Sequence, residues 1–375
     1  MRKLIFGIGQ IDTLKYFALQ LYKAAQRQQI ECMTFEFGTD EVQKIIAGGD
    51  CALVVFNMRT DVDAWEKMGI PIYDILVDHP RRFTEFNENA IHNLSLIVLD
   101  RQQVRYCNEH FPRIRQTFFM PLGGAREGEL IPFEKRHIKV LYAGSNSFSP
   151  YYPAISFRED RGEKIYQDAY RLIIEQPDLT GEEVLQLIGI ADGIDFRAPE
   201  WKPYVWKIAD ALEQNARAYY KQKMMQLLSE QGIEVEVYGN NWEIPGYTYR
   251  DNIHFHAPVS SEEINRITGD AQISLNSMPW FKDGAHDRIF TAMMSGAISM
   301  TDPSRYLLEH FEHGKNIVYY NLTDMEPMID NIRFLQSHPK TAEKIAEEGR
   351  LVAEKEDTWD LRLQQLMNFM ENSEK

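Results

Sequence analysis

The residues best suited to chemistry in this sequence are His286, Asp287 and Arg288, in the stretch GAHDRIFTAMMSGAISMTD at 284–302. The apolar residues after them recur at helical spacing, Gly296 stands where a helix ends, and AISMT predicts a strand leading to Asp302. The three polar residues therefore fall at a helix N-terminus, where backbone N–H groups bind anions and an arginine can hold phosphate. This pattern favours a diphosphate site. The alternative is an ordinary αβ unit whose polar residues only cap the helix.

A second candidate pair is Asp78 and His79, in the segment LVDHPRRF at 76–83. Both residues come at the end of an apolar strand that Pro80 stops, so their side chains are expected at a ligand-binding edge. An imidazole beside a carboxylate can act as a general base or bind sugar hydroxyls. A helix cap followed by a loop histidine is the simpler alternative.

The first glycine-rich loop, GIGQID at 7–12, is a weaker signal. It contains Gly7 and Gly9 but no third glycine at the dinucleotide spacing, and no acidic partner follows at the expected distance. The loop is more typical of a tight turn that lets a ligand or another domain approach the backbone.

Several elements must position these residues. Apolar runs in the first half predict parallel strands at 3–9, 31–37, 51–57, 71–78, 94–100 and 116–122, and helix-like segments separate some of them at 13–28, 40–49 and 63–69. Near-continuous apolar strands alternating with helices indicate a Rossmann-like domain over 1–130. Its ligands should bind beyond the carboxyl ends of the strands.

A second alternation of strands and helices begins near residue 131. Strands are expected at 138–144, 233–239, 252–258, 271–276 and 297–301, and long helical patterns at about 154–230 indicate a helical insertion. His254 and His256 alternate along one strand, which indicates sheet histidines rather than a metal site. The residues from Pro339 onward predict two amphipathic helices.

Composition excludes several classes of protein. The chain of 375 residues carries a formal charge of -15, which speaks against non-specific nucleic-acid binding. Three scattered cysteines fit neither a disulfide framework nor a cysteine-based metal site. No apolar run has the length of a transmembrane segment, and the start lacks the features of a signal peptide, so a cytoplasmic protein is expected.

Several motifs occur in one order along the chain. They are VDHP at 77–80, PLGG at 121–124, YAGS at 142–145, YGNNW at 238–242, HDRIF at 286–290, SGA at 295–297 and FEHGKNIVYY at 311–320. In these motifs the sequence resembles the group 1 (family 4-like) glycosyltransferases of the GT-B fold, and within them a bacterial spore-maturation-type subfamily.

This resemblance implies an α/β fold of two Rossmann-like domains facing each other across a cleft. An acceptor domain would occupy 1–130. A nucleotide-sugar domain with the helical insertion would occupy 131–355, and a final helix at 356–375 would cross back to the first domain.

The resemblance also implies roles for residues. His286 and Arg288 would hold the diphosphate, with Gly144 and Ser145 opposite them. Further donor contacts are expected from Tyr238, Gly239, Asn240, Lys282, Asp283, Asp302 and Glu309. The second residue of the family's acidic pair is replaced by Thr291, for which Glu309 is a candidate substitute. The basic pair after the first strand of the second domain is also missing from GSNSFS at 144–149, and Lys282, Arg305 or Lys315 are candidate substitutes.

The expected function is therefore a metal-independent glycosyltransferase without a cofactor. It would move a sugar from a nucleoside diphosphate, with a UDP-sugar as the expected donor, to an unknown protein, glycan or small molecule. Asp78 and His79 would act on the acceptor side, and His286 and Arg288 on the leaving diphosphate. The alternatives are a non-catalytic scaffold that binds nucleotide sugars and a nicotinamide-dependent oxidoreductase.

Overall fold

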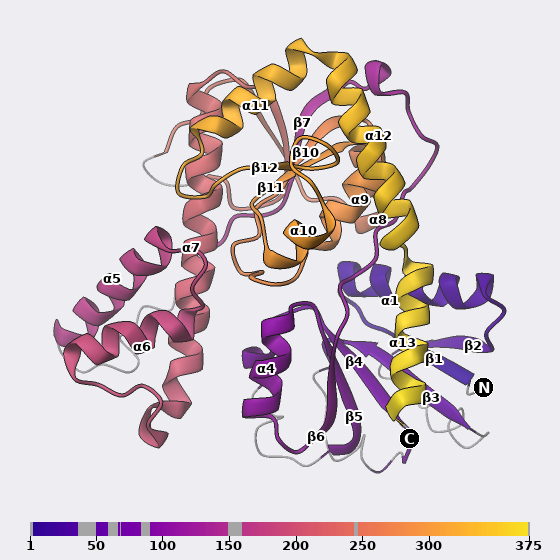
Figure 1. The fold of residues 1–375 in the computed structure, drawn as a ribbon, viewed down its shortest axis with the longest axis vertical. Coiled ribbons are helices and arrows are strands. Elements are labelled where there is room, and N and C mark those ends of the chain that lie inside the picture. The colour runs from indigo at the N-terminus through magenta and orange to yellow at the C-terminus, as the bar shows by residue number, and fades with distance from the viewer. Residues whose placement is uncertain are drawn as a thin grey trace.

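Two parallel β-sheets, one in each half of the chain, form the framework of this protein (Figure 1). The structure is a computed structural model that describes residues 3–36, 50–58, 67, 69–83, 91–148, 160–243 and 247–373. The expected fold class is confirmed: there are two Rossmann-like halves, a helical insertion and a C-terminal helix that crosses back to the first half.

The N-terminal sheet has the strand order β2-β1-β3-β4-β5-β6. The strands are β1 (Lys3–Ile8), β2 (Cys32–Glu36), β3 (Cys51–Phe56), β4 (Ile72–Leu76), β5 (Ile91–Val98) and β6 (Ile114–Phe119). Every residue of β3 and β4 is buried, as expected for central strands covered on both faces. Around this sheet lie α1 (Asp12–Arg27), a 3-10 turn η1 (Pro80–Arg82) and α4 (Arg101–His110). The helices expected at 40–49 and 63–69 lie almost wholly outside the described residues.

The C-terminal sheet has the order β12-β11-β10-β7-β8-β9. Its strands are β7 (Ile138–Ala143), β8 (Val235–Tyr238), β9 (Ile253–His256), β10 (Ala271–Leu275), β11 (Ile298–Thr301) and β12 (Val318–Tyr319). The helices of this half are α8 (Ser261–Thr268), α9 (Asp287–Met294), α10 (Arg305–His310), α11 (Glu326–Ser337) and α12 (Pro339–Glu356). A short turn, η3 (Phe133–Lys135), precedes the sheet.

The insertion between β7 and β8 consists of α5 (Asp160–Glu175), α6 (Gly181–Asp192), a turn η5 (Pro199–Trp201) and α7 (Lys202–Glu230). Helices α5 and α6 stand to one side of both sheets, whereas α7 runs from them up along the C-terminal half (Figure 1). With 29 residues, α7 is about 44 Å long at the usual rise per residue. One helix therefore reaches from the level of the N-terminal half to the C-terminal sheet.

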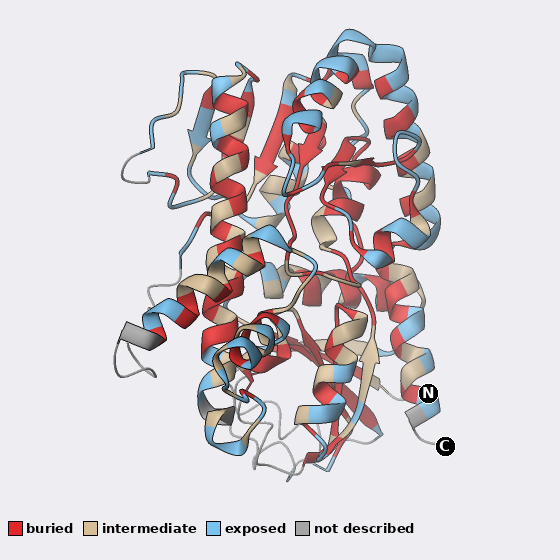
Figure 2. Cartoon of the chain, turned by 60° about the vertical axis from the view of Figure 1, so that its left-hand side comes forward, coloured by how far each residue is buried: buried red, intermediate tan, exposed pale blue. Residues whose placement is uncertain are grey.

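The last helix, α13 (Trp359–Ser373), returns to the N-terminal half and packs against α1. The rings of Phe17 and Trp359 lie 5.6 Å apart, and Phe118 stacks on Phe369 at 4.6 Å. Buried residues fill the central strands of both sheets and continue through the junction between the halves (Figure 2). One apolar cluster includes Phe17 of α1, Phe290 of α9 and Trp359 of α13, so the two halves share a core.

Candidate active site

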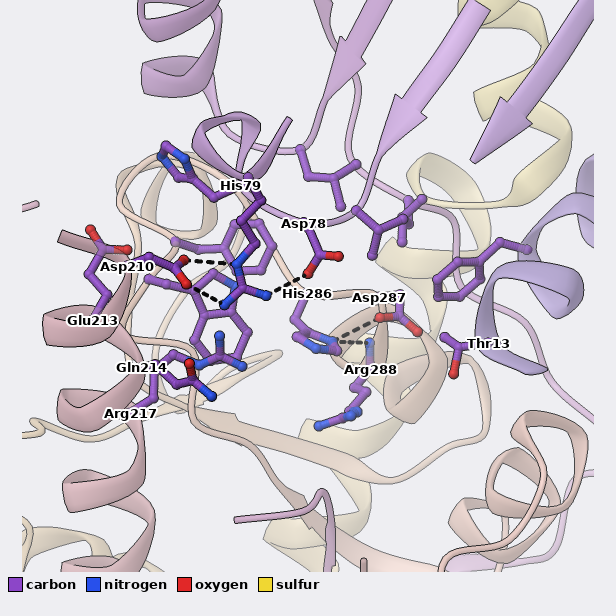
Figure 3. Close-up of a pocket in the computed structure, with 17 residues that line it drawn as sticks. Thr13, Asp78, His79, Asp210, Glu213, Gln214, Arg217, His286, Asp287 and Arg288 are labelled. Atoms are coloured by element: carbon purple, nitrogen blue, oxygen red, sulfur yellow. Dashed lines mark hydrogen bonds and ion pairs between the residues drawn. The ribbon is translucent and has the colours of Figure 1, made fainter. Parts of the chain in front are cut away.

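A cavity of about 180 Å³ lies between the two halves, at the carboxyl ends of their strands (Figure 3). The N-terminal half lines it with residues that follow β1, β4, β5 and β6. The C-terminal half contributes one face of α7, the loop at 280–281 and the start of α9. Ligands of open parallel sheets bind at this edge, and here two such edges meet.

Asp78 faces this cavity from the loop after β4 (Figure 3). Its carboxylate accepts hydrogen bonds from Asn57 Nδ2 at 3.0 Å and from Arg82 Nη1 at 3.4 Å. Asn57 adopts a positive φ of 49°, and its Oδ1 accepts the backbone N–H of Val77 at 2.7 Å. These contacts fix the carboxylate at the cavity, where it can accept a hydrogen bond from a ligand hydroxyl.

His79 caps the turn η1 in this structure. Its Nδ1 accepts the backbone N–H of Arg81 at 3.1 Å and the Nε–H of the same residue at 2.9 Å. Burial and the charges of Arg81 and Arg82 hold the pKa of His79 well below its usual value. The neutral imidazole therefore has one nitrogen occupied, which matches the cap alternative; its acceptor-side role stays a prediction.

The loop that carries Asp78 is anchored to the insertion by two arginines that make three ion pairs. Arg82 forms a bidentate pair with Asp210 of α7, with distances of 2.8 and 3.0 Å. Arg81 is 1% exposed and contacts Glu213 of α7 at 2.9 Å and Glu182 of α6 at 3.3 Å. The loop after β4 is thus held by the opposite half of the molecule.

His286 is the N-cap of α9 and lines the cavity. Its Nδ1 lies 2.8 Å from Asp287 Oδ1 and 3.3 Å from the backbone nitrogen of Arg288, and it can serve only one of these contacts at a time. Burial and the charge of Arg288 lower the pKa of His286. A neutral ring can hydrogen-bond a ligand at this position but adds no positive charge.

The Arg288 side chain faces the loop that follows β7. Its Nη1 lies 3.1 Å from the position that a Cβ atom would occupy at Gly144, so the guanidinium is close to the backbone of this turn. The loop after β8 packs against the same turn: Gly144 N donates to Tyr238 O at 2.8 Å, and Asn240 N donates to Ser145 Oγ at 2.9 Å.

The expected donor contacts therefore fall into two groups. Gly144, Ser145, Tyr238, Gly239 and Asn240 form one joined pair of loops beside Arg288. Lys282, Asp283, Asp302 and Glu309 form the other group. Neither group is among the residues that line the cavity, and the donor contacts of both stay predictions.

Each of these four side chains is engaged elsewhere. Lys282 donates to the carbonyls of Pro177 and Pro279. Asp283 and Glu309 pair with Arg101 at 3.3 and 2.7 Å. Asp302 is buried, where its Oδ1 accepts the Met278 N–H at 2.7 Å, and burial raises its pKa to about 7. Among the other candidates, Lys315 is exposed and pairs with Glu312, and the Thr291 hydroxyl accepts the Ala125 N–H.

Two cations at the site were missed by sequence reasoning. Arg217 and Lys221 of α7 lie near Arg288, and Arg217 lines the cavity. The only signal was their spacing of four residues, which places them on one helix face. The apolar pattern of the surrounding helix indicated a packing role instead.

Within the described ranges, no group of three His, Cys, Asp or Glu side chains could hold a metal ion. His254 and His256 instead contact Glu234 at 2.8 Å and Glu236 at 2.5 Å. No helix in the part of the chain that the structure describes is long and apolar enough to cross a membrane.

Comparisons with known proteins agree with this geometry. Residues 217–368 match a family model described as glycosyl transferase-like. Comparison with curated protein sequences gave no match. Anabaena HepE in complex with UDP and glucose is similar in structure, with a TM-score of 0.53 and 11% identity over 99% of this chain and 100% of that chain.

Two further solved structures share the fold. T4 phage BGT in complex with its UDP-glucose substrate gives a TM-score of 0.55 at 11% identity, covering 100% of this chain and 99% of that one. Sucrose-phosphate synthase from Thermosynechococcus elongatus gives 0.52 at 10% identity, covering 99% of each chain. At these identities the likeness defines the fold, which is GT-B. The fold and the family match together define a glycosyltransferase of the GT-B class.

Proposed function

We propose that this protein transfers a sugar from a nucleoside diphosphate, with a UDP-sugar as the expected donor, to an acceptor bound beside Asp78. The observation that carries the proposal is the N-terminus of α9, where Arg288 faces the Gly144–Ser145 turn across the donor side of an interdomain cavity. Helix N-termini and arginine bind phosphate groups. The motifs HDRIF and YGNNW further support the spore-maturation-type subfamily as part of this proposal.

In this reaction an acceptor oxygen attacks the anomeric carbon, and the bond from that carbon to the diphosphate oxygen breaks. The leaving diphosphate takes the electron pair, and the acceptor hydroxyl gives its proton to the carboxylate of Asp78. Arg288 and the backbone N–H groups of α9 stabilise the charge that develops on the diphosphate. The carboxylate of Asp78 accepts the acceptor hydroxyl's hydrogen bond and orients it. His286, neutral and beside Arg288, hydrogen-bonds the sugar or the phosphate.

The first experiment is a thermal-shift panel of UDP, GDP, ADP, TDP and their common sugars in EDTA. A ligand that binds only the folded protein raises its melting temperature. We expect the diphosphate and the sugars of one base to raise the melting temperature. If no ligand of the panel raises the melting temperature of the folded protein, the proposal is contradicted.

Turnover is then measured as release of free nucleoside diphosphate. Arg288→Ala should lower this rate by about 10²–10³-fold, the loss typical of removing a group that stabilises a developing oxyanion. The control is Arg266→Ala, at a half-exposed arginine of α8 that pairs only with Glu262 and Glu263. Equal rates in the wild type and Arg288→Ala would refute the role of Arg288.

The same assay separates a transferase from a scaffold. Thr291 replaces a carboxylate that the family resemblance expects, and its hydroxyl contacts a backbone N–H of the N-terminal half. Nucleotide-sugar binding without any release of nucleoside diphosphate would favour the scaffold.

A further inference from the structure

Helix α7 brings two basic side chains to the donor side of the cavity. Lys221 Nζ donates to the carbonyl of Ser145 at 2.8 Å, in the turn that faces Arg288. The guanidinium of Arg217 lies over the ring of Trp280, 3.8 Å from its centroid. Arg217 and Lys221 are one helical turn apart, so both point to the same side of α7. Lys221 and Arg288 therefore lie at the Gly144–Ser145 turn, and Arg217 lies one helical turn of α7 from Lys221, over Trp280.

These three cations have no carboxylate partner. In the described part of the chain, no Asp or Glu oxygen lies within ion-pair distance of the side chain of Arg217, Lys221 or Arg288. Among the arginines buried elsewhere in the described residues, Arg81 pairs with Glu213 at 2.9 Å and Arg362 with Asp357 at 2.5 Å, whereas Arg136 donates to backbone carbonyls only. Lys221 is buried, and Arg217 and Arg288 are half-buried. Like charges brought together without a carboxylate repel one another, so such a cluster is expected where a ligand supplies the opposite charge.

The surroundings of these cations disfavour their charged forms, as the lowered pKa values of Lys221 and Arg217 indicate. Burial, together with the charges of Arg217 and Arg288, holds the pKa of Lys221 well below its ordinary value. Burial and the charge of Arg82 lower the pKa of Arg217 to about 10, although the carboxylates of Glu213, Asp210 and Asp78 act to raise it. An anion between these side chains would offset both the repulsion and the lost hydration.

We propose that Arg217 and Lys221 of α7 complete a three-cation clamp with Arg288, and that its ligand is the diphosphate of a nucleoside diphosphate. This inference rests on the proposed function and assigns the phosphate contacts to α7 instead of the loop after β7. That loop, GSNSFS, has no basic residue of its own. Three cations balance the two to three negative charges of a diphosphate, so the clamp holds it without a divalent cation.

The test measures the affinities of UDP and inorganic pyrophosphate by titration calorimetry in EDTA. Pyrophosphate is included because it probes the clamp independently of the nucleobase. The variants are Arg217→Gln and Lys221→Met, which keep most of the side-chain volume. Lys223→Met, on the same helix, is the matched control, and circular dichroism checks that each variant is folded.

We expect each clamp variant to weaken both ligands at least about tenfold, the loss of one charge-assisted hydrogen bond, while the control stays within about twofold. Lys221 should also take up a proton on binding at alkaline pH, so the binding enthalpy should depend on the buffer in the wild type but not in Lys221→Met.

The failures of the two proposals are distinguishable. If the wild type binds UDP and Arg288→Ala weakens it, but Arg217→Gln and Lys221→Met bind it normally, the clamp is refuted and the proposed function stands. If the wild type binds neither pyrophosphate nor any nucleotide of the thermal-shift panel, both proposals are refuted.

Discussion

Replacing Asp302 with asparagine should make the protein more stable at neutral and alkaline pH. Asp302 is 3% exposed, and its Oδ1 accepts the Met278 N–H at 2.7 Å. Burial raises the pKa of this carboxyl to about 7 from an ordinary value of 3.8. An asparagine has nearly the same shape, and its amide oxygen can accept the same hydrogen bond without ever carrying a charge.

The magnitude follows from the two pKa values. The folded protein binds the Asp302 proton more tightly than the unfolded chain does, so the stability that the protonated carboxyl contributes is complete below about pH 4. That contribution is lost as the pH rises through about 7. The full difference of about three pH units corresponds to about 4 kcal/mol, which is an upper limit for this group.

The assay is differential scanning calorimetry of the wild type and Asp302→Asn at intervals from pH 5 to 8. We expect the variant's melting temperature to exceed that of the wild type increasingly as the pH rises, by roughly 2–4 °C for each kcal/mol. Asp330→Asn, at an exposed carboxylate of α11, should follow the wild-type curve. If the melting temperatures of the wild type and Asp302→Asn change with pH in parallel, the raised pKa of Asp302 is refuted.

Two further substitutions test contacts around the cavity: an ion pair between the two halves and the contact between the loops after β7 and β8. Arg81→Met leaves Glu213 buried without its partner and should cost about 3–5 kcal/mol in urea unfolding; a loss below about 1 kcal/mol would argue against this. Adding Glu213→Met should recover part of the loss. Gly239→Ala, at a φ of 155°, forces a Cβ against the Gly144 carbonyl and should weaken UDP binding, whereas Gly9→Ala meets no atom within 4 Å and should not. Unchanged UDP affinity in Gly239→Ala would show that these two loops tolerate separation.

Sequence reasoning predicted the sheets well because their signal is local. Each strand of the N-terminal sheet overlaps a predicted apolar run, although β5 and β6 begin two to three residues earlier than expected, and β3 and β4 are buried on both faces. Only β12, with two residues, was too short to produce such a run. Patterns of burial along a few consecutive residues are sufficient for this kind of prediction.

The site was predicted in part, because its members come from distant segments. The motif at 286–288 and the Gly144–Ser145 turn carry their own turn and cap signals, and the structure brings them together. Lys282 has no such signal. Its position beside the 284–302 stretch suggested a donor contact, but its side chain turns toward two proline carbonyls.

Arg217 is the opposite case, because it lines the cavity but was not predicted from the sequence. Its place at the cavity depends on how α7 crosses the C-terminal half, and no local pattern encodes that crossing.

The crossing of α13 has a consequence for synthesis on the ribosome. The N-terminal Rossmann-like half packs α1 against a helix that is made after the second half: Phe17 of α1 meets Trp359, and Arg27 pairs with Asp360 at 2.6 Å. Until residues 359–373 emerge, this apolar face of the first half has no cover. The nascent chain must therefore carry an exposed apolar surface through the synthesis of the whole second half, which is the condition under which chaperones engage a nascent domain.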